Sequence, residues 1–152
     1  MLTTSCGLFQ IDKEVSRKAK FEITNPDSLI WREVKIANVD VAFESKKLKA
    51  TFYVFSHCDE SYNLSLEQTQ KNILKDFSEL KTQNARNIQM ISREGLSTEF
   101  SGKIDGIKVS GIITNIQKDY CQFDFVLVES KKDMISVSAR SAFDDFLKGF
   151  KF

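Results

Sequence analysis

The stretch LSTEFSGKIDGIKVSGII, residues 96–113, predicts a β-hairpin. Apolar or small residues alternate with polar residues on either side of its centre, which is the period of a strand with one buried face. Asp105-Gly106 lies at that centre, and this dipeptide favours a two-residue type I′ turn because both positions need positive φ. The turn and the alternation then predict the same register, in which Phe100 faces Gly111.

Similar patterns on both sides of this hairpin predict more strands. Alternating apolar residues in 121–127 predict a third strand of the same sheet, and 39–43 and 48–54 predict a second hairpin. Pairing that hairpin about Lys46-Lys47 places Phe43 opposite Ala50. Because Lys-Lys lacks the turn chemistry of Asp-Gly, a longer bulged loop is the alternative. Short strands are also expected at 21–24 and 88–91.

Two segments have helical patterns. Residues 65–80 carry an apolar stripe, and Ser65 with Gln68 forms a capping box that satisfies free N–H groups of the first turn. Polar residues 82–87 are expected to form the loop that leaves this helix. Ser138 or Ser141 is expected to cap a last helix that ends near Gly149.

Length and composition indicate a soluble globular domain. The chain has 152 residues, of which 41% are apolar and 28% charged, with a net charge of +1. It has no basic stripe for a phosphate backbone, so we expect no nucleic-acid partner. The short pairs Lys46-Lys47 and Lys131-Lys132 are interpreted as solvated turns. No run of 18 apolar residues occurs, so any membrane contact would depend on a lipid anchor.

The order of the expected elements predicts an α+β fold. Strands, a helix, strands and a helix follow one another, without the regular βαβ alternation of a parallel sheet. We therefore expect an antiparallel sheet of about five to six strands, flanked by helices, in a single domain over residues 20–152. Residues 1–19 are expected to be a separate start and tether.

The first residues, MLTTSCG, resemble the end of a bacterial lipoprotein signal peptide. In such peptides, small residues precede a cysteine that is acylated and becomes the mature N-terminus. Cys6 follows Thr4 and Ser5, which are suitably small. The charged and apolar regions of a signal peptide do not precede it in this sequence, so an ordinary cysteine near the N-terminus is the alternative.

The chain as a whole resembles the PsbP-like sandwich proteins. The resemblance rests on helix 65–80, on the hairpin around GKIDG at 102–106, on KDYC at 118–121, and on FDDFLKGF at 143–150. That fold includes the photosystem protein PsbP, Ran-binding Mog-type proteins and bacterial lipoproteins, and the last group is the most similar. The resemblance implies an antiparallel sheet with flanking helices and a role in binding or assembly. It implies no catalytic residue.

The cysteines and the histidine allow more than one interpretation. If Cys6 carries lipid, Cys58 and Cys121 are left as an even pair that could form a disulfide; two buried free thiols are the alternative. His57 is the only histidine, and its neighbour Cys58 points to the opposite face of a strand, so no metal site is expected. Carboxylates such as Asp119 and Asp124 could pair.

These observations predict a non-catalytic binding or assembly domain. We expect a lipid-anchored monomer on the periplasmic face of the bacterial cell envelope, with an unknown protein or small-molecule ligand and no cofactor. One alternative is a cytoplasmic adaptor of the same fold. The other is an enzyme that uses His57 with a nearby acid, for which the sequence shows no complete set of catalytic groups.

Overall fold

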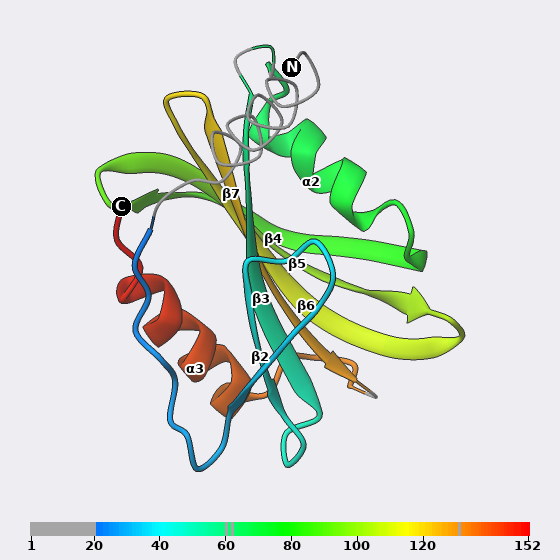
Figure 1. Ribbon diagram of the computed structural model, residues 1–152. Helices are drawn as coiled ribbons and strands as arrows, with labels where there is room; N and C mark the ends of the chain where they lie inside the picture. Colours follow the sequence, from blue (N-terminus) through cyan, green and yellow to red (C-terminus); the bar gives the residue numbers. More distant parts are fainter. Residues whose placement is uncertain (1–20, 60, 62, 131) are drawn as a thin grey trace, which may run out of the picture.

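The computed structural model describes residues 21–152, except residues 60, 62 and 131. Within that part of the chain, seven strands form one antiparallel sheet and two helices pack on it (Figure 1). The strand order across the sheet is β1-β2-β3-β7-β6-β5-β4. The strands are β1 (Arg32–Val34), β2 (Val41–Ser45), β3 (Ala50–Cys58), β4 (Ser78–Met90), β5 (Arg93–Ile104), β6 (Ile107–Lys118) and β7 (Cys121–Ser130), and the helices are α2 (Leu66–Leu74) and α3 (Val137–Lys148).

The α+β class and the antiparallel sheet are confirmed, but the sheet is larger than the five to six strands predicted. The strand expected at residues 21–24 is reduced to a single bridge between Glu22 and Lys151, because Pro26 and Asp27 end the extended run soon after it begins. This bridge places the start of the described chain beside its C-terminus. The predicted boundary between residues 19 and 20 lies outside the described residues.

The central hairpin has the predicted register. Ile104 faces Ile107, and Phe100 faces Gly111. Asp105 and Gly106 have φ values of 51° and 76°, as a type I′ turn requires. The ring of Phe100 covers Gly111 so closely that a Cβ there would lie 2.3 Å from Cζ of the ring. Glycine at 111 is therefore a packing requirement of this strand pair.

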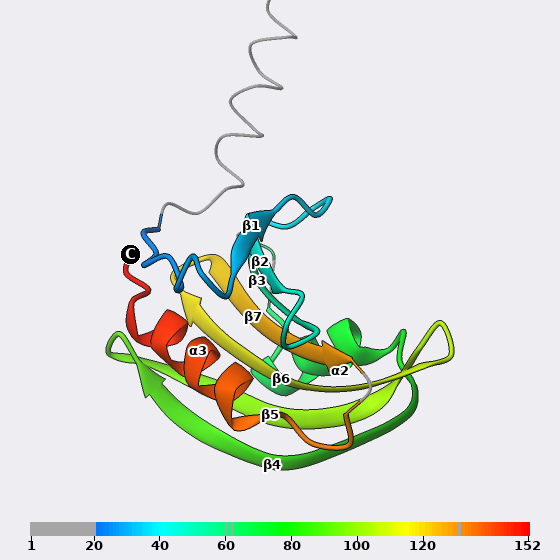
Figure 2. The same ribbon diagram turned by 90° about the horizontal axis from the view of Figure 1, so that it is seen from below.

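The two helices cover opposite faces of the sheet. Ile112 packs into the cluster that includes Phe143 and Phe146 of α3, whereas Ile113 packs with Leu74 of α2. Because successive strand residues point to opposite faces, this pair shows that both faces of β6 are buried. Figure 2 shows the sheet curving around α3.

Aromatic rings dominate the core beneath α3. The ring centroids of Phe52 and Phe146 are 4.8 Å apart, and those of Trp31 and Phe52 are 4.6 Å apart. Phe125 and Phe150 meet edge to face at 4.9 Å. Contacts of this kind add about 0.5–1.5 kcal/mol per pair to the burial of apolar area. The many phenylalanines of the sequence are thus concentrated on one face of the sheet.

The first helix begins where predicted but ends earlier. Ser65 is the N-cap, and the reciprocal hydrogen bonds with Gln68 measure 3.0 and 3.1 Å. The helix ends at Leu74, six residues before the predicted end, and the chain enters β4 at Ser78. Residues 82–87, predicted as a loop, belong to that strand. β4 is exposed along most of its length, so its sequence lacks the alternation that reveals a half-buried strand.

The hairpin of β2 and β3 is shifted by two residues from the predicted register. Phe43 faces Phe52 rather than Ala50, and Ser45 faces Ala50. The loop therefore contains four residues, 46–49, and Lys49 has a φ of 53°. The hydroxyl of Ser45 accepts the backbone N–H of Leu48 at 3.1 Å, which stabilises this longer turn. The alternative of a longer loop is the correct one.

The last helix begins earlier than predicted. Ser136, not Ser138 or Ser141, is its N-cap and accepts the N–H of Ala139 at 3.2 Å. The same serine donates its hydroxyl to Glu129 Oε2 at 2.5 Å and its backbone N–H to Oε1 at 2.9 Å. Glu129 is completely buried on β7, so it fixes the start of α3 to the sheet.

Candidate functional site

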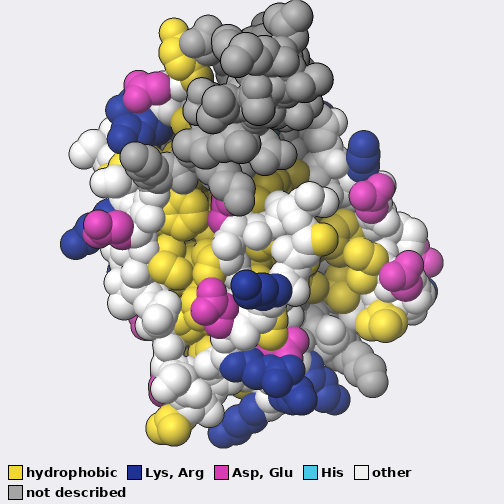
Figure 3. All heavy atoms as spheres, viewed as in Figure 1, with side chains coloured by type: hydrophobic (Ala, Val, Ile, Leu, Met, Phe, Trp, Pro, Cys, Tyr) yellow, Lys and Arg dark blue, Asp and Glu magenta, His cyan; other side chains and the backbone are white. Residues whose placement is uncertain are grey.

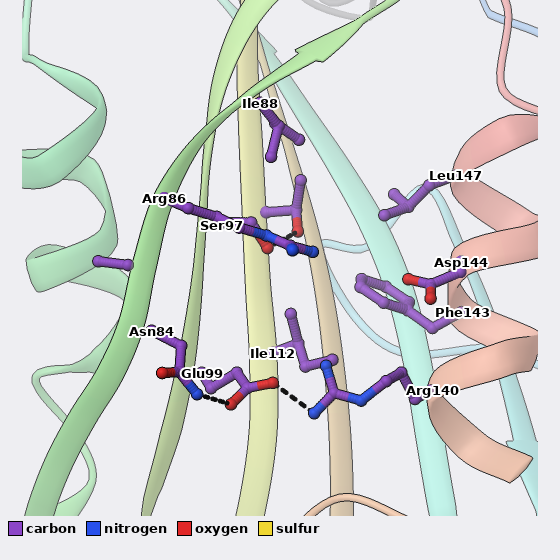
Figure 4. Close-up of a pocket in the computed structure, with 12 residues that line it drawn as sticks. Asn84, Arg86, Ile88, Ser97, Glu99, Ile112, Arg140, Phe143, Asp144 and Leu147 are labelled. Atoms are coloured by element: carbon purple, nitrogen blue, oxygen red, sulfur yellow. Dashed lines mark hydrogen bonds and ion pairs between the residues drawn. The ribbon is translucent and has the colours of Figure 1, made fainter. Parts of the chain in front are cut away.

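A groove runs between α3 and the strands at one edge of the sheet (Figure 4). It encloses about 450 Å³ against β4, β5 and β6, and it continues into a hollow of about 480 Å³ beside the end of β4. The two parts share Arg86, Ile88, Asp144 and Leu147. Isoleucine, leucine and phenylalanine side chains provide apolar surface, and charged groups lie on both walls. Such a groove suits an elongated ligand with both apolar and charged parts.

One ion pair spans the groove. Arg140 of α3 binds Glu99 Oε1 of β5, and Asn84 of β4 donates a 2.6 Å hydrogen bond to Glu99 Oε2. Burial by itself raises the pKa of Glu99, but the hydrogen bonds from Asn84 and Arg140 and the charges of Arg140 and Arg86 outweigh it and hold the pKa below its usual range. Glu99 is therefore an ionised carboxylate with both oxygens engaged.

The strands explain how these side chains reach the groove. Along β5, alternation directs Ser97 and Glu99 toward α3. Strand β4 breaks its register between Gln83 and Arg86, and Asn84 there has a φ of 54°. A bulge of this kind re-aims side chains. Arg86 points across the groove toward α3, near Asp144, and forms no ion pair with any residue that the structure describes (Figure 4).

A second polar cluster lies on the opposite face, beneath α2. Gln70 donates to Asn115 Oδ1 at 3.1 Å and accepts the Thr98 hydroxyl hydrogen bond at 2.6 Å. Asn115 Nδ2 donates to the carbonyl of Leu66 at 3.1 Å. These bonds attach the first turns of α2 to β5 and β6. Since all three polar side chains are buried, the network stabilises the fold rather than meeting a solute.

Asp124 belongs to the same buried layer and is 2% exposed. Gln122 donates a 3.0 Å hydrogen bond to its Oδ1. Burial raises the pKa of Asp124 to about 7, although hydrogen bonds from Gln122 and Asn115 act in the opposite direction. Tyr53 also has a raised pKa, because of its own burial and then the nearby charge of Asp124. The carboxyl lies beneath protein on all sides, which makes it a group that influences stability.

The structure brings Cys58 and Cys121 together. They face each other in the register of β3 and β7, and their sulfur atoms are joined as a disulfide with a length of 2.03 Å. His57, next to Cys58, is half exposed, and its Nε2 lies 3.8 Å from Asp59 Oδ2. Cys6 lies outside the described residues.

The other sequence-derived candidates do not form a site. Asp119 is exposed in the turn between β6 and β7, whereas Asp124 is buried in β7, so the two carboxylates do not pair. Among residues 21–152, apart from the three gaps, no group of three or more His, Cys, Asp or Glu side chains could hold a metal ion. Within the same residues, neither helix is long and apolar enough to cross a membrane.

The groove residues were missed by sequence reasoning. Glu99 lies on the polar side of an alternating strand, which the sequence assigns to solvent, and Arg140 and Asn84 come from elements whose limits were wrong. The face of β5 that carries Glu99 is covered by a helix that begins 33 residues after the end of the strand. No local pattern predicts this contact, because the groove is formed by four elements, α3, β4, β5 and β6, that are separate in the sequence.

Comparisons with known proteins relate the fold to solved structures. No family model matches the sequence, and no curated protein matches it. The solution structure of cyanobacterial PsbP (CyanoP) from Synechocystis superposes with a TM-score of 0.61 and 14% identity, covering 86% of this chain and 85% of that one. LpqN of Mycobacterium tuberculosis, described as involved in cell envelope biogenesis, gives 0.60 and 9%, covering 87% and 82%.

A protein from Bacteroides thetaiotaomicron also matches, with a TM-score of 0.60 and 11% identity. That match covers 86% of this chain but 44% of the other, which is a longer protein. At these identities the likeness concerns the fold alone. Together with the sheet order, the superpositions show that this chain has the PsbP-like fold.

Proposed function

We propose that the chain is a non-catalytic binding or assembly domain of the bacterial cell envelope, anchored through an acylated Cys6. The groove between α3 and β4–β6 is the observation that carries this proposal. A PsbP-like protein involved in cell envelope biogenesis, LpqN, supports the location. The disulfide of Cys58 and Cys121 supports it too, since disulfides persist mainly in oxidising compartments. A cytoplasmic adaptor of the same fold is the alternative.

The groove favours binding over catalysis. Among the described residues that line it there is no His or Cys, and Glu99 has both oxygens engaged by Arg140 and Asn84. A general base must accept a proton near neutral pH, and a carboxylate with a lowered pKa does so poorly. The ion pair instead joins helix and sheet across the groove. A preformed, rigid groove reduces the ordering cost of binding.

In-cell photo-cross-linking tests the groove. A photoreactive residue at Asp144, exposed in the groove, should give an adduct of one defined mass in the native host. As a control, the same photoreactive residue is placed at Ile107, which is 48% exposed on the β5–β6 hairpin and lies outside the groove. Adducts of equal yield from both positions, or none from Asp144, would contradict binding in the groove.

Cell fractionation tests the anchor separately. The wild-type protein should sediment with membranes and begin at Cys6, and Cys6→Ser should release it to the soluble fraction. Mass spectrometry that finds Met1 intact on protein from the native host would refute acylation. The bonding state of Cys58 and Cys121 in the same sample distinguishes an oxidising from a reducing compartment.

A further inference from the structure

Lysines from distant parts of the sequence meet at one end of the molecule. Lys46, Lys47 and Lys49 lie in the turn between β2 and β3. The N–H of Ser130 at the end of β7 donates to the carbonyl of Lys49 at 2.9 Å, which brings the segment with Lys132 beside this turn. Figure 3 shows the resulting group of Lys and Arg side chains at the lower edge of the molecule. We call Lys46, Lys47, Lys49 and Lys132 the lysine end.

Two carboxylates around the lysine end form ion pairs with other groups, and two more, Asp27 and Asp145, line the hollow beside Lys47. Glu44 pairs with Arg32, and Asp133 pairs with Lys108. Asp27 accepts the backbone N–H two residues further on, at 2.9 Å. No ion pair joins a carboxylate to the lysine end within the part of the chain that the structure describes. The four exposed lysines therefore present an excess of positive charge at neutral pH.

Large apolar side chains project from the same end. Leu29 is 93% exposed, Val137 84% and Met134 74%. The loop 24–31, the β2–β3 turn and the first turn of α3 line one hollow, so these segments are neighbours. Val137 is the first residue of α3, and the first turn contains no acidic residue. The Glu129 carboxyl, bonded to Ser136 at this helix start, offsets the positive end of the helix dipole, so the positive charge of this end comes from the lysines.

We propose that the lysine end docks on an anionic phospholipid surface, with Leu29, Met134 and Val137 entering the headgroup layer. Lysine side chains are attracted to an anionic membrane surface, and buried apolar area adds to this attraction. Separate aliphatic side chains among lysines suit this surface better than a protein partner. The cores of protein interfaces are instead depleted in lysine and enriched in aromatic residues. This contact does not depend on the groove or on Cys6.

Vesicle co-sedimentation of the full chain tests the contact. Cys6→Ser removes acylation, so binding to phosphatidylcholine vesicles that contain phosphatidylglycerol reports on the protein surface alone. Lys46→Glu/Lys47→Glu should weaken binding at least tenfold and reduce its salt dependence, since two attractions become repulsions. Lys71→Glu/Lys75→Glu makes the same charge change on exposed positions of the α2 segment and should bind like the parent protein.

A second pair of variants tests the apolar contribution. Leu29→Ser should weaken binding several-fold, because it removes apolar area that enters the headgroup layer. Tyr120→Ser, 62% exposed in the β6–β7 turn at the opposite end of β7 from Ser130, should leave binding unchanged. The proposal is overturned if the Cys6→Ser parent protein does not sediment with anionic vesicles. It is overturned as well if the Lys46/Lys47 and Lys71/Lys75 variants lose vesicle affinity equally. It is also overturned if the parent binds soluble polyglutamate but not vesicles, since the partner would then be an acidic macromolecule.

Discussion

Replacing Asp124 with Asn should change how stability depends on pH. In the folded protein, burial raises the pKa of this carboxyl to about 7, from an ordinary value of 3.8. The unfolded chain therefore releases the proton at a lower pH than the folded protein does. Between these two values the folded state binds more protons, so the contribution of Asp124 to stability falls as pH rises and becomes constant above about pH 8.

The size of the effect follows from the shift. A difference of about three pKa units corresponds to about 4 kcal/mol of destabilisation above pH 8, of which somewhat less than half is already present at pH 5. In Asp124→Asn, the amide keeps an oxygen that can accept the 3.0 Å hydrogen bond from Gln122 but has no proton to lose. The variant should therefore gain about 2–3 kcal/mol relative to the wild type between pH 5 and pH 8.

Urea unfolding from pH 5 to pH 8 measures this gain directly. Trp31 is 4% exposed and reports unfolding by fluorescence, with the disulfide left intact. Asp119→Asn, in the exposed β6–β7 turn, is the matched carboxylate control. A constant difference between Asp124→Asn and wild type across this range would refute the reasoning, as would an NMR titration that places the pKa of Asp124 below 5.

Three further predictions concern packing, the cysteines and the helix cap. Gly111→Ala should destabilise the protein by about 2 kcal/mol or more, because the new Cβ meets the Phe100 ring and a backbone carbonyl within 2.4 Å; chemical denaturation measures this, and an unchanged midpoint would contradict the packing. Thiol titration of denatured, unreduced protein from the native host should find neither Cys58 nor Cys121 reactive, and two reactive thiols from this pair would show that the bridge is absent. Replacing both cysteines with Ser should lower the free energy of unfolding by on the order of 4 kcal/mol at most, since the bridge closes a loop with a separation of 63 residues. Ser136→Ala should lower the free energy of unfolding by about 1–2 kcal/mol, because it removes the cap of α3 and one partner of buried Glu129. Ser138→Ala, at an exposed helical position, should lower it by only a few tenths of a kcal/mol, and equal losses of stability in the two variants would argue against the cap.

The parts of the fold that the sequence predicts are those where two signals agree. At residues 96–113, the Asp-Gly turn and the alternation specify one register, and the structure has that register. At Lys46-Lys47 only the alternation was available, which leaves the register undetermined by multiples of two residues; the error was two. The hydrogen bond from Leu48 to Ser45 that decides it is not visible in a hydrophobic pattern.

The groove could not be predicted for a related reason. Residues 78–87 of strand β4 are exposed, so their polar sequence looks like a loop, and without β4 one wall of the groove is missing from the prediction. The pairing of Glu99 with Arg140 depends on where α3 crosses the curved sheet, which involves contacts between residues far apart in the sequence. The capping box of Ser65, by contrast, lies within four residues and was predicted correctly.

The two shifts in the pairing of β4 affect how neighbouring copies of this domain can interact. β4 is a free edge of the described sheet, and thirteen residues in register would offer a long row of unpaired backbone groups to another chain. Two shifts in its pairing, with positive φ at Glu79 and Asn84, leave Arg86–Met90 as the longest regular run. The opposite edge, β1, has three residues. Stable cross-β stacking needs segments of about six or seven residues, so copies of this domain packed side by side on a surface can remain separate molecules.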